Sequence, residues 1–197
     1  MVLDDGSKDN TLEVLQKFGN DIVLSRHDRT GPIPLLNVGM RAASAPLIAF
    51  FDADDRLEPG YFSKLMEPFA WSGCAYSFCD YFECEYGSPR PTTEVRLHGN
   101  PYCGTGIGGF MYRQESLLEV RGFDEGLHTP EYYAFPEYDL LMKFEAAGEG
   151  FAHIPLPLWT YVRRPSSMSA ELRGARMERG KEVLRKRHGW LPEMRSF

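Results

Sequence analysis

Short apolar runs alternate with amphipathic segments through the first seventy residues. Residues 1–3, 22–24 and 47–51 are apolar and end at polar or turn-forming residues, which is typical of buried strands. The segments that follow them, from about Thr11, over residues 35–43 and over residues 59–69, carry helix-start signals or apolar side chains at helical spacing. This alternation predicts a parallel sheet covered by helices.

The pattern changes in the second half of the chain. Residues 75–86 form a long aromatic run typical of a strand in a mixed sheet, whereas residues 87–106 show no period. Helices are predicted over residues 113–120, 138–147 and 171–188, and one further strand over residues 158–162. Gly122 and Gly148 follow two of these helices, as glycine commonly does at helix ends.

Composition describes a folded globular protein and limits its partners. Of the 197 residues, 43% are hydrophobic and 25% are charged, which is enough for a sizeable core. A net charge of −6 argues against nucleic acid as a partner. The four cysteines match neither a disulfide scaffold nor a zinc-binding spacing, so free thiols are expected. Because no apolar run could cross a membrane and no signal peptide is visible, we expect a cytoplasmic protein.

Carboxylates gather where two of the predicted strands end. Asp4 and Asp5 follow the first strand, and Asp52, Asp54 and Asp55 follow the most apolar one. In open α/β sheets, ligands bind beyond the carboxyl ends of the strands. Crowded carboxylates repel one another unless a cation offsets them, and these hard oxygen ligands suit Mg²⁺ or Mn²⁺. Each cluster alone is equally well explained as a turn, but two clusters at equivalent strand ends favour a site.

Five short segments carry a specific resemblance. They read VLDDGSKDNT at residues 2–11, NVG at 37–39, FDADD at 51–55, GGF at 108–110 with GFDE at 122–125, and EYDL at 137–140. In this order they resemble the catalytic domain of a family 2 glycosyltransferase with a GT-A fold, over about residues 2–170. The resemblance implies an α/β architecture in which helices flank a mixed, mostly parallel sheet. It divides the chain into a glycosyltransferase domain at residues 1–170 and a basic C-terminal helix and tail at residues 171–197.

The resemblance also implies a reaction and its donor-side residues. Such enzymes transfer a sugar from a nucleotide-diphospho-sugar to an acceptor hydroxyl, saccharide or lipid-linked, with inversion at the anomeric carbon. By position, Asp4 and Asp5 would face the nucleoside and Asn37 would bind the nucleotide. Asp52 would lie near the ribose or in the metal shell, and Asp54 would bind the Mg²⁺ or Mn²⁺ that bridges the diphosphate. A bound cation stabilises the charge that develops on a departing diphosphate.

The acceptor-side residues follow from the same resemblance. Glu137 takes the place of the family's aspartate base, with Asp139 as the fallback, although acidic residues in a first helical turn are also explained by stability alone. Arg163 and Arg164 would pair with diphosphate oxygens, as guanidinium groups do. The Gly108–Gly109 pair would line the acceptor side, with a plain turn nearly as probable on the residues alone.

Two departures from the family pattern keep a second hypothesis open. The family's first strand and helix are absent, so the chain resembles an N-terminally truncated domain whose exposed sheet edge predicts homodimerisation or an altered edge. Leu36 also stands where the family often has arginine. The alternative is a catalytically silent relative that acts as a binding or assembly partner.

The predicted C-terminal helix is basic. Residues 171–190 hold seven Lys or Arg against three Glu. Such a helix could contact an anionic membrane peripherally, but its apolar stripe is thin, which favours a solvated helix.

Overall fold

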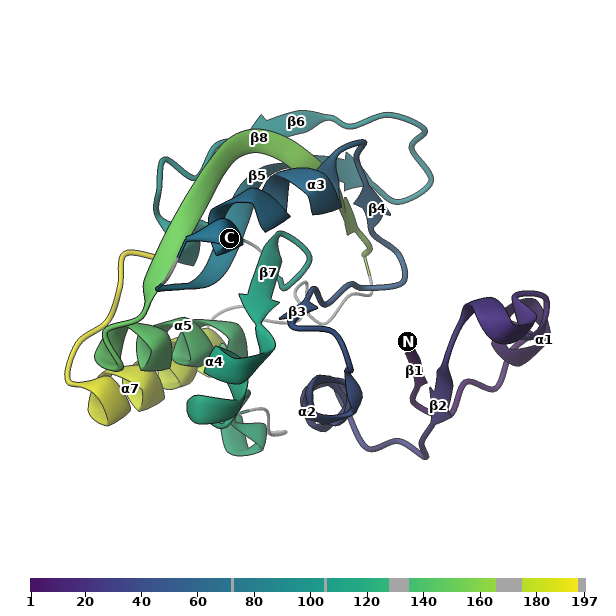
Figure 1. Ribbon diagram of the computed structural model, residues 1–197, viewed down its shortest axis with the longest axis horizontal. Helices are drawn as coiled ribbons and strands as arrows, with labels where there is room; N and C mark the ends of the chain where they lie inside the picture. Colours follow the sequence, from purple (N-terminus) through teal and green to yellow (C-terminus); the bar gives the residue numbers. More distant parts are fainter. Residues whose placement is uncertain (72, 105, 128–134, 166–174, 195–197) are drawn as a thin grey trace.

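The computed structural model describes residues 1–71, 73–104, 106–127, 135–165 and 175–194, and Figure 1 shows their arrangement. Two sheets are present in these residues, one with two strands and one with six. The small sheet and its helix lie at one end of the molecule, and the C-terminal helix lies at the other end (Figure 1).

The small sheet is parallel and contains β1 (Val2–Asp4) and β2 (Leu24–Arg26). The predicted first helix is confirmed as α1 (Thr11–Gln16) and is followed by the 3₁₀ turn η1 (Gly19–Asp21). Next comes α2 (Pro32–Ala42), which packs closely on β1, because a Cβ on Gly39 would lie 2.9 Å from Leu3 Cδ1. Among the described residues β1 pairs with β2 alone, so its other edge is open.

The large sheet is mixed, as predicted. Its order is β3-β7-β5-β8-β4, with β6 also pairing to β5. The strands are β3 (Leu47–Ile48), β4 (Arg56–Leu57), β5 (Cys74–Glu85), β6 (Thr93–Val95), β7 (Phe110–Arg113) and β8 (Gly150–Arg163). Of the described strand pairs only β1–β2 and β5–β8 are parallel. The other four pairs, all in the large sheet, are antiparallel, whereas a mostly parallel sheet was expected.

The core forms around β5. Nearly every residue of β5 is buried, because β5 is covered on both faces and flanked by β7 and β8. The helices α3 (Tyr61–Met66), α4 (Gln114–Glu119) and α5 (Pro136–Ala146) contribute core side chains, joined by the turns η2 (Glu67–Ala70), η3 (Pro101–Cys103) and η4 (Glu125–Leu127). Of the predicted strand at residues 47–51 only the first two residues pair, and the remainder leads into the carboxylates.

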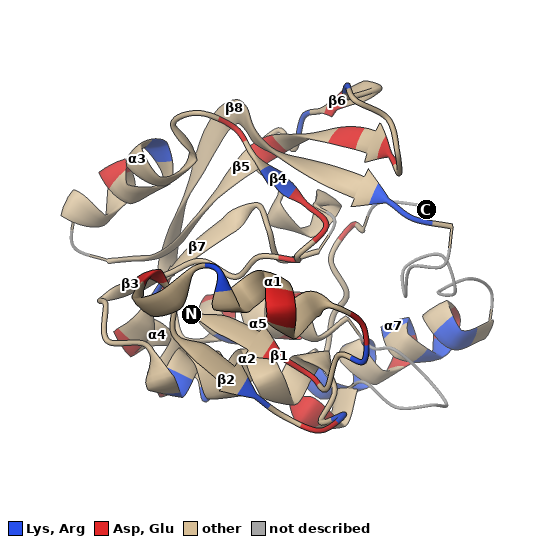
Figure 2. Cartoon of the chain, turned by 90° about the vertical axis from the view of Figure 1, so that its right-hand side faces the viewer, with Lys and Arg blue, Asp and Glu red and all other residues tan. Residues whose placement is uncertain are grey.

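The C-terminal helix α7 (Ala175–His188) lies beside α5 (Figure 1). Its Leu184 is completely buried in the common core, and Met177 and Val183 pack against that core. The thin apolar stripe therefore docks the helix, in contrast to the solvated helix that its composition favoured. Lys and Arg residues are spread along α7 (Figure 2), and four of the six are exposed. Across the described residues, no helix combines the length and apolar character that crossing a bilayer requires.

Candidate functional site

The turn that follows β3 brings three aspartates close together, and hydrogen bonds fix its conformation. It is closed by a hydrogen bond from the Asp55 N–H to the Asp52 carbonyl, 3.1 Å long, and it leads directly into β4. Asp55 Oδ1 accepts a hydrogen bond from the Val162 N–H of β8 at 3.0 Å. Asp55 Oδ2 is buried and has no hydrogen-bond partner within the described part of the chain.

The electrostatics of this turn show a shortage of positive charge. Burial raises the pKa of Asp55 to about 7, against the Val162 hydrogen bond that lowers it, and the charges of Asp52 and Asp54 raise it further. Although Asp52 is exposed as a residue, the protein around its carboxyl and the nearby Asp54 charge raise its pKa as well. Burial and neighbouring negative charge therefore both disfavour the ionised form of these two carboxyl groups.

A cationic side chain already reaches this turn. Arg164 Nε lies 2.7 Å from Asp54 Oδ2, and the guanidinium carbon lies 4.5 Å from the centre of the Tyr86 ring. The structure thus brings together a residue predicted to bind the metal and a residue predicted to bind the diphosphate. Arg163 points elsewhere, because its Nη2 pairs with the nearly buried Glu83 at 2.8 Å. The predicted diphosphate role of Arg163 is not supported by this contact, and Arg164 is the available arginine.

The donor set fits a divalent cation that is shared with a substrate. Asp52 and Asp54 supply hard carboxylate oxygens, and the unpartnered Asp55 Oδ2 lies in the same turn. No group of three or more His, Cys, Asp or Glu side chains within the described ranges could hold a metal ion by itself. Mg²⁺ is commonly bound by one or two carboxylates together with substrate phosphates, so an incomplete protein shell is the expected arrangement.

Glycines beside the turn serve packing. A Cβ on Gly109 would lie 2.5 Å from Trp159 Nε1, and one on Gly108 would lie 2.8 Å from the same indole and 3.2 Å from Asp55 Oδ2. Trp159 itself is a core residue with 1% of its surface exposed. Tyr61 holds the loop by donating a hydrogen bond to the Gly108 carbonyl at 2.7 Å. The close approach that requires glycine here is therefore to the tryptophan.

The predicted nucleoside residues lie at the ends of β1 and β2. Asp4 is buried, accepts a hydrogen bond from the Ser7 N–H at 3.1 Å and pairs with Arg26 at 3.4 Å. These contacts, led by Ser7, lower the pKa of Asp4. Asp5 accepts hydrogen bonds from the Thr30 and Gly31 N–H groups, at 2.6 and 2.9 Å. Both carboxylates thus organise the loops after their strands, and contact with a nucleoside stays a prediction.

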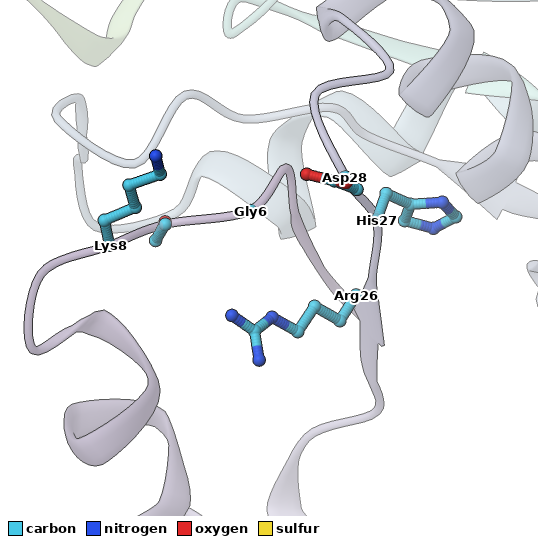
Figure 3. A pocket seen from close by; sticks show the side chains of 6 residues that line it. Gly6, Lys8, Arg26, His27 and Asp28 are labelled. Carbon is cyan, nitrogen blue, oxygen red and sulfur yellow. The ribbon is translucent and has the colours of Figure 1, made fainter.

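A cavity of about 450 Å³ opens beside these loops and is basic in character. It is lined by Gly6, Ser7, Lys8, Arg26, His27 and Asp28. Figure 3 shows the Arg26 side chain extending between β2 and the residue 6–8 loop, whereas the His27 ring lies on the other side of β2. Lys8 and Arg26 bring two positive charges to this lining against one negative charge from Asp28, which suits an anionic ligand.

The predicted base region lies in the first turn of α5. Glu137 is partly exposed there, and Asp139 is completely buried. The Asp139 carboxylate is surrounded by Lys143 at 3.0 Å, Arg187 at 3.2 Å and His188 at 2.8 Å. A carboxylate that is buried and held by Lys143, Arg187 and His188 cannot reach an acceptor hydroxyl, so the fallback assignment of Asp139 as base is corrected to a structural role.

Asn37 is also structural. Its side chain is 3% exposed, and its Oδ1 accepts a hydrogen bond from the Phe123 N–H at 3.0 Å. Its Nδ2 donates to the Phe123 carbonyl at 2.8 Å and to Glu125 Oε1 at 2.9 Å. Because these contacts engage the whole amide, the predicted nucleotide contact of Asn37 is replaced by a link between α2 and the loop after α4.

The sequence pattern predicts the carboxylate turn but not every residue around the candidate site. The structure brings Asp52, Asp54 and Asp55 together with Arg164, whereas no hydrogen bond or ion pair within the described residues joins Asp4 or Asp5 to them. Asp55 belongs to the acidic run that predicts a site, although no separate role was assigned to it. Lys8 and Arg26, which line the cavity beside β1 and β2, were not among the predicted site residues, and Arg26 could have been found from its place at the end of a strand.

Comparison with solved structures identifies the fold as GT-A. Residues 1–349 of S. aureus TarS, in complex with UDP-GlcNAc, match with a TM-score of 0.66 and 20% identity over 94% of this chain. The mannosyltransferase PcManGT from Pyrobaculum calidifontis, in complex with GDP-Man and Mn²⁺, matches with a TM-score of 0.70 and 14% identity over 97% of this chain. In both cases the match spans 55% of the neighbour's length.

The sequence comparison defines the family. The model of glycosyl transferase family 2 matches residues 1–123, and the chain belongs to this family. No curated protein matches the sequence.

Proposed function

We propose that this chain transfers a sugar from a nucleotide-diphospho-sugar to an acceptor hydroxyl, with inversion at the anomeric carbon. The observation that carries the proposal is the carboxylate turn after β3, where Asp55 Oδ2 is buried without a partner and Asp54 meets Arg164. Membership of family 2 and the sugar nucleotides named for the two structural neighbours support the donor class.

Asp52 and Asp54 are the residues that would hold a Mg²⁺ or Mn²⁺ ion. When bound, such an ion supplies positive charge that stabilises the departing diphosphate. The raised pKa values of Asp52 and Asp55 support this assignment, because crowded, partly desolvated carboxylates gain most from a neighbouring cation.

Arg164 is the candidate for the diphosphate itself. Its side chain is 42% exposed, and its guanidinium rests over the Tyr86 ring while it pairs with Asp54. A guanidinium binds phosphate oxygens through the same donors that it uses for a carboxylate. Arg164 can therefore pass from Asp54 to a diphosphate without a change in the chemistry of the contact. The basic cavity at Lys8 and Arg26 is proposed to receive another part of the nucleotide.

Glu137 is proposed as the general base. In a single displacement, the acceptor oxygen forms a bond to the anomeric carbon as the bond to the diphosphate oxygen breaks, and the hydroxyl proton passes to the Glu137 carboxylate. Its place in the first turn of an eleven-residue helix suits a carboxylate, since the helix dipole favours negative charge there. That the acceptor is a saccharide or a lipid-linked molecule stays a prediction. Homodimerisation also stays a prediction.

The test is a donor-turnover assay on the purified chain. UDP- and GDP-sugars are incubated with Mn²⁺ and an oligosaccharide acceptor, released nucleoside diphosphate is measured, and NMR of the product reports the anomeric configuration. We expect Asp54→Asn and Glu137→Gln to lose turnover, and the exposed Asp21→Asn in η1 to retain it. Equal turnover in Asp54→Asn and the unchanged chain would contradict the proposal. Tight nucleotide binding without any turnover would favour the catalytically silent alternative.

A further inference from the structure

A set of polar contacts around the buried Asp139 connects the C-terminal helix to the helix that carries Glu137. Asp139 has no exposed surface, and a buried carboxylate of this kind is stable only when it is paired. Lys143, one turn along the same helix, supplies one partner at 3.0 Å. The other two, Arg187 and His188, come from the last residues of α7, nearly fifty positions later in the chain.

The same set of contacts fixes the loop after α4. Arg187 also pairs with Asp124, and this contact lowers the pKa of Asp124 although burial opposes the change. Lys143 donates a hydrogen bond to the Gly122 carbonyl at 3.0 Å. The loop that Asn37 binds from α2 is thus held from α5 and α7 as well.

The first turn of α5 needs such support. Phe135, which precedes the helix, has φ of +47°, a left-handed conformation that is unfavourable for a bulky residue. The Asp139 N–H donates to the Phe135 carbonyl at 3.0 Å, and the Tyr138 hydroxyl donates to the Gly104 carbonyl at 2.9 Å. Contacts at residues 138 and 139 therefore secure a strained entry to the helix.

Glu137 and Asp139 lie on opposite sides of α5 and have different surroundings. Residues two positions apart differ by about 200° around a helix, so their side chains point in nearly opposite directions. Glu137 is partly exposed, whereas Asp139 is buried and faces Arg187 and His188 of α7. Because both residues belong to the same turn of α5, a shift of Asp139 would move the backbone that carries Glu137.

We propose that His188 and Arg187 are positioning residues for catalysis, which act by clamping Asp139 and so orienting Glu137. This role rests on the proposed function of Glu137 as the base. It makes α7 a part of the active enzyme, and truncation of this helix would impair the chemical step in addition to any loss of stability. A misplacement of a catalytic group by about 1 Å can reduce the rate by about 100-fold.

The test compares two changes at one position in the full chain. His188→Leu removes the polar contact to Asp139, whereas His188→Gln places an amide nitrogen near the position of the imidazole Nε2. We expect His188→Leu to lower kcat by at least about tenfold with the donor KM unchanged within about twofold, and His188→Gln to restore most of kcat. Arg185→Ala, on the exposed side of the same helix, is the control and should leave kcat unchanged.

A second readout is independent of turnover. Amide hydrogen exchange at residues 138–141 should accelerate in His188→Leu but not in Arg185→Ala, while the amides of α2 keep their protection. Equal kcat in His188→Leu and Arg185→Ala would overturn the positioning role, as would parallel losses of kcat, donor affinity and global stability that His188→Gln fails to rescue. If the chain without substitutions shows no turnover, the proposed function fails and this role fails with it. If His188→Leu exchanges its amides at residues 138–141 no faster than the chain without substitutions, the clamp itself is absent.

Discussion

Asp55→Asn should stabilise the chain at neutral and higher pH and destabilise it near pH 4. In the folded chain the pKa of Asp55 is raised from 3.8 to about 7, mainly because the carboxyl is buried. Between these two values the folded state binds the proton more tightly than the unfolded state does. The free energy of unfolding therefore falls as pH rises through this window, and asparagine, which has no proton to lose, avoids that decline.

The magnitude follows from the size of the shift. One pKa unit corresponds to 1.36 kcal/mol, so a shift of about three units makes the pH-dependent difference about 4 kcal/mol between pH 4 and pH 8. Asparagine can keep the acceptor for the Val162 N–H, but its amide group replaces the unpartnered Oδ2 and adds a cost of about 1–3 kcal/mol that does not vary with pH. At pH 8 the variant should be more stable by about 1–3 kcal/mol.

The assay is urea unfolding followed by tryptophan fluorescence, from pH 4 to pH 8, with a chelator present. The quantity of interest is the difference in unfolding free energy between Asp55→Asn and the unchanged chain at each pH. A difference that stays constant within about 0.5 kcal/mol over this range would refute the reasoning. Asp21→Asn, in which an exposed carboxylate outside the turn is removed, serves as the control and should show such a flat difference.

Three further predictions concern packing and thiol chemistry. Gly109→Ala should destabilise the chain by about 1–3 kcal/mol in the same unfolding assay, because the new Cβ would overlap the Trp159 indole; an unchanged midpoint would show that the tryptophan moves freely. Leu184→Ala should cost about 2–5 kcal/mol, since the side chain is completely buried, whereas a cost below about 0.5 kcal/mol would return α7 to a solvated helix. Burial raises the pKa of the Cys79 thiol to about 12, so Cys79 should react slowly with a thiol reagent at pH 8, and the half-buried Cys103 should react first in the native chain. Mass spectrometry identifies the modified cysteine, and fast reaction of Cys79 would contradict the described core.

Local patterns predicted the helices well and the strand pairing less well. The helix expected over residues 138–147 is α5 within two residues at its start and one at its end, because its apolar spacing and the glycine after it are local signals. The antiparallel pairing of β3 with β7 depends on residues more than sixty positions apart. A pattern of burial along one strand does not contain the direction of its neighbour, so the parallel arrangement was inferred too widely.

In the candidate site, too, local sequence features were predictable and contacts between distant residues were not. The carboxylate turn was visible as a run of acidic residues after an apolar strand, and the resemblance gave its chemistry. Asn37 and Asp139 were assigned by motif, but their burial depends on Phe123 and on the end of α7, which no local pattern reveals. The pairing of Arg164 with Asp54 joins residues over a hundred positions apart and could only be read from the structure.

The central claim, that the turn after β3 holds a cation for a nucleoside diphosphate, is tested most directly by calorimetric titration of UDP and GDP with and without Mn²⁺. We predict that Mn²⁺ strengthens binding of at least one of them by about tenfold or more, equivalent to 1.4 kcal/mol, and that Asp54→Asn abolishes this gain while Asp21→Asn keeps it. If Asp54→Asn shows the same Mn²⁺ dependence as the unchanged chain, the cation lies elsewhere and the account is contradicted.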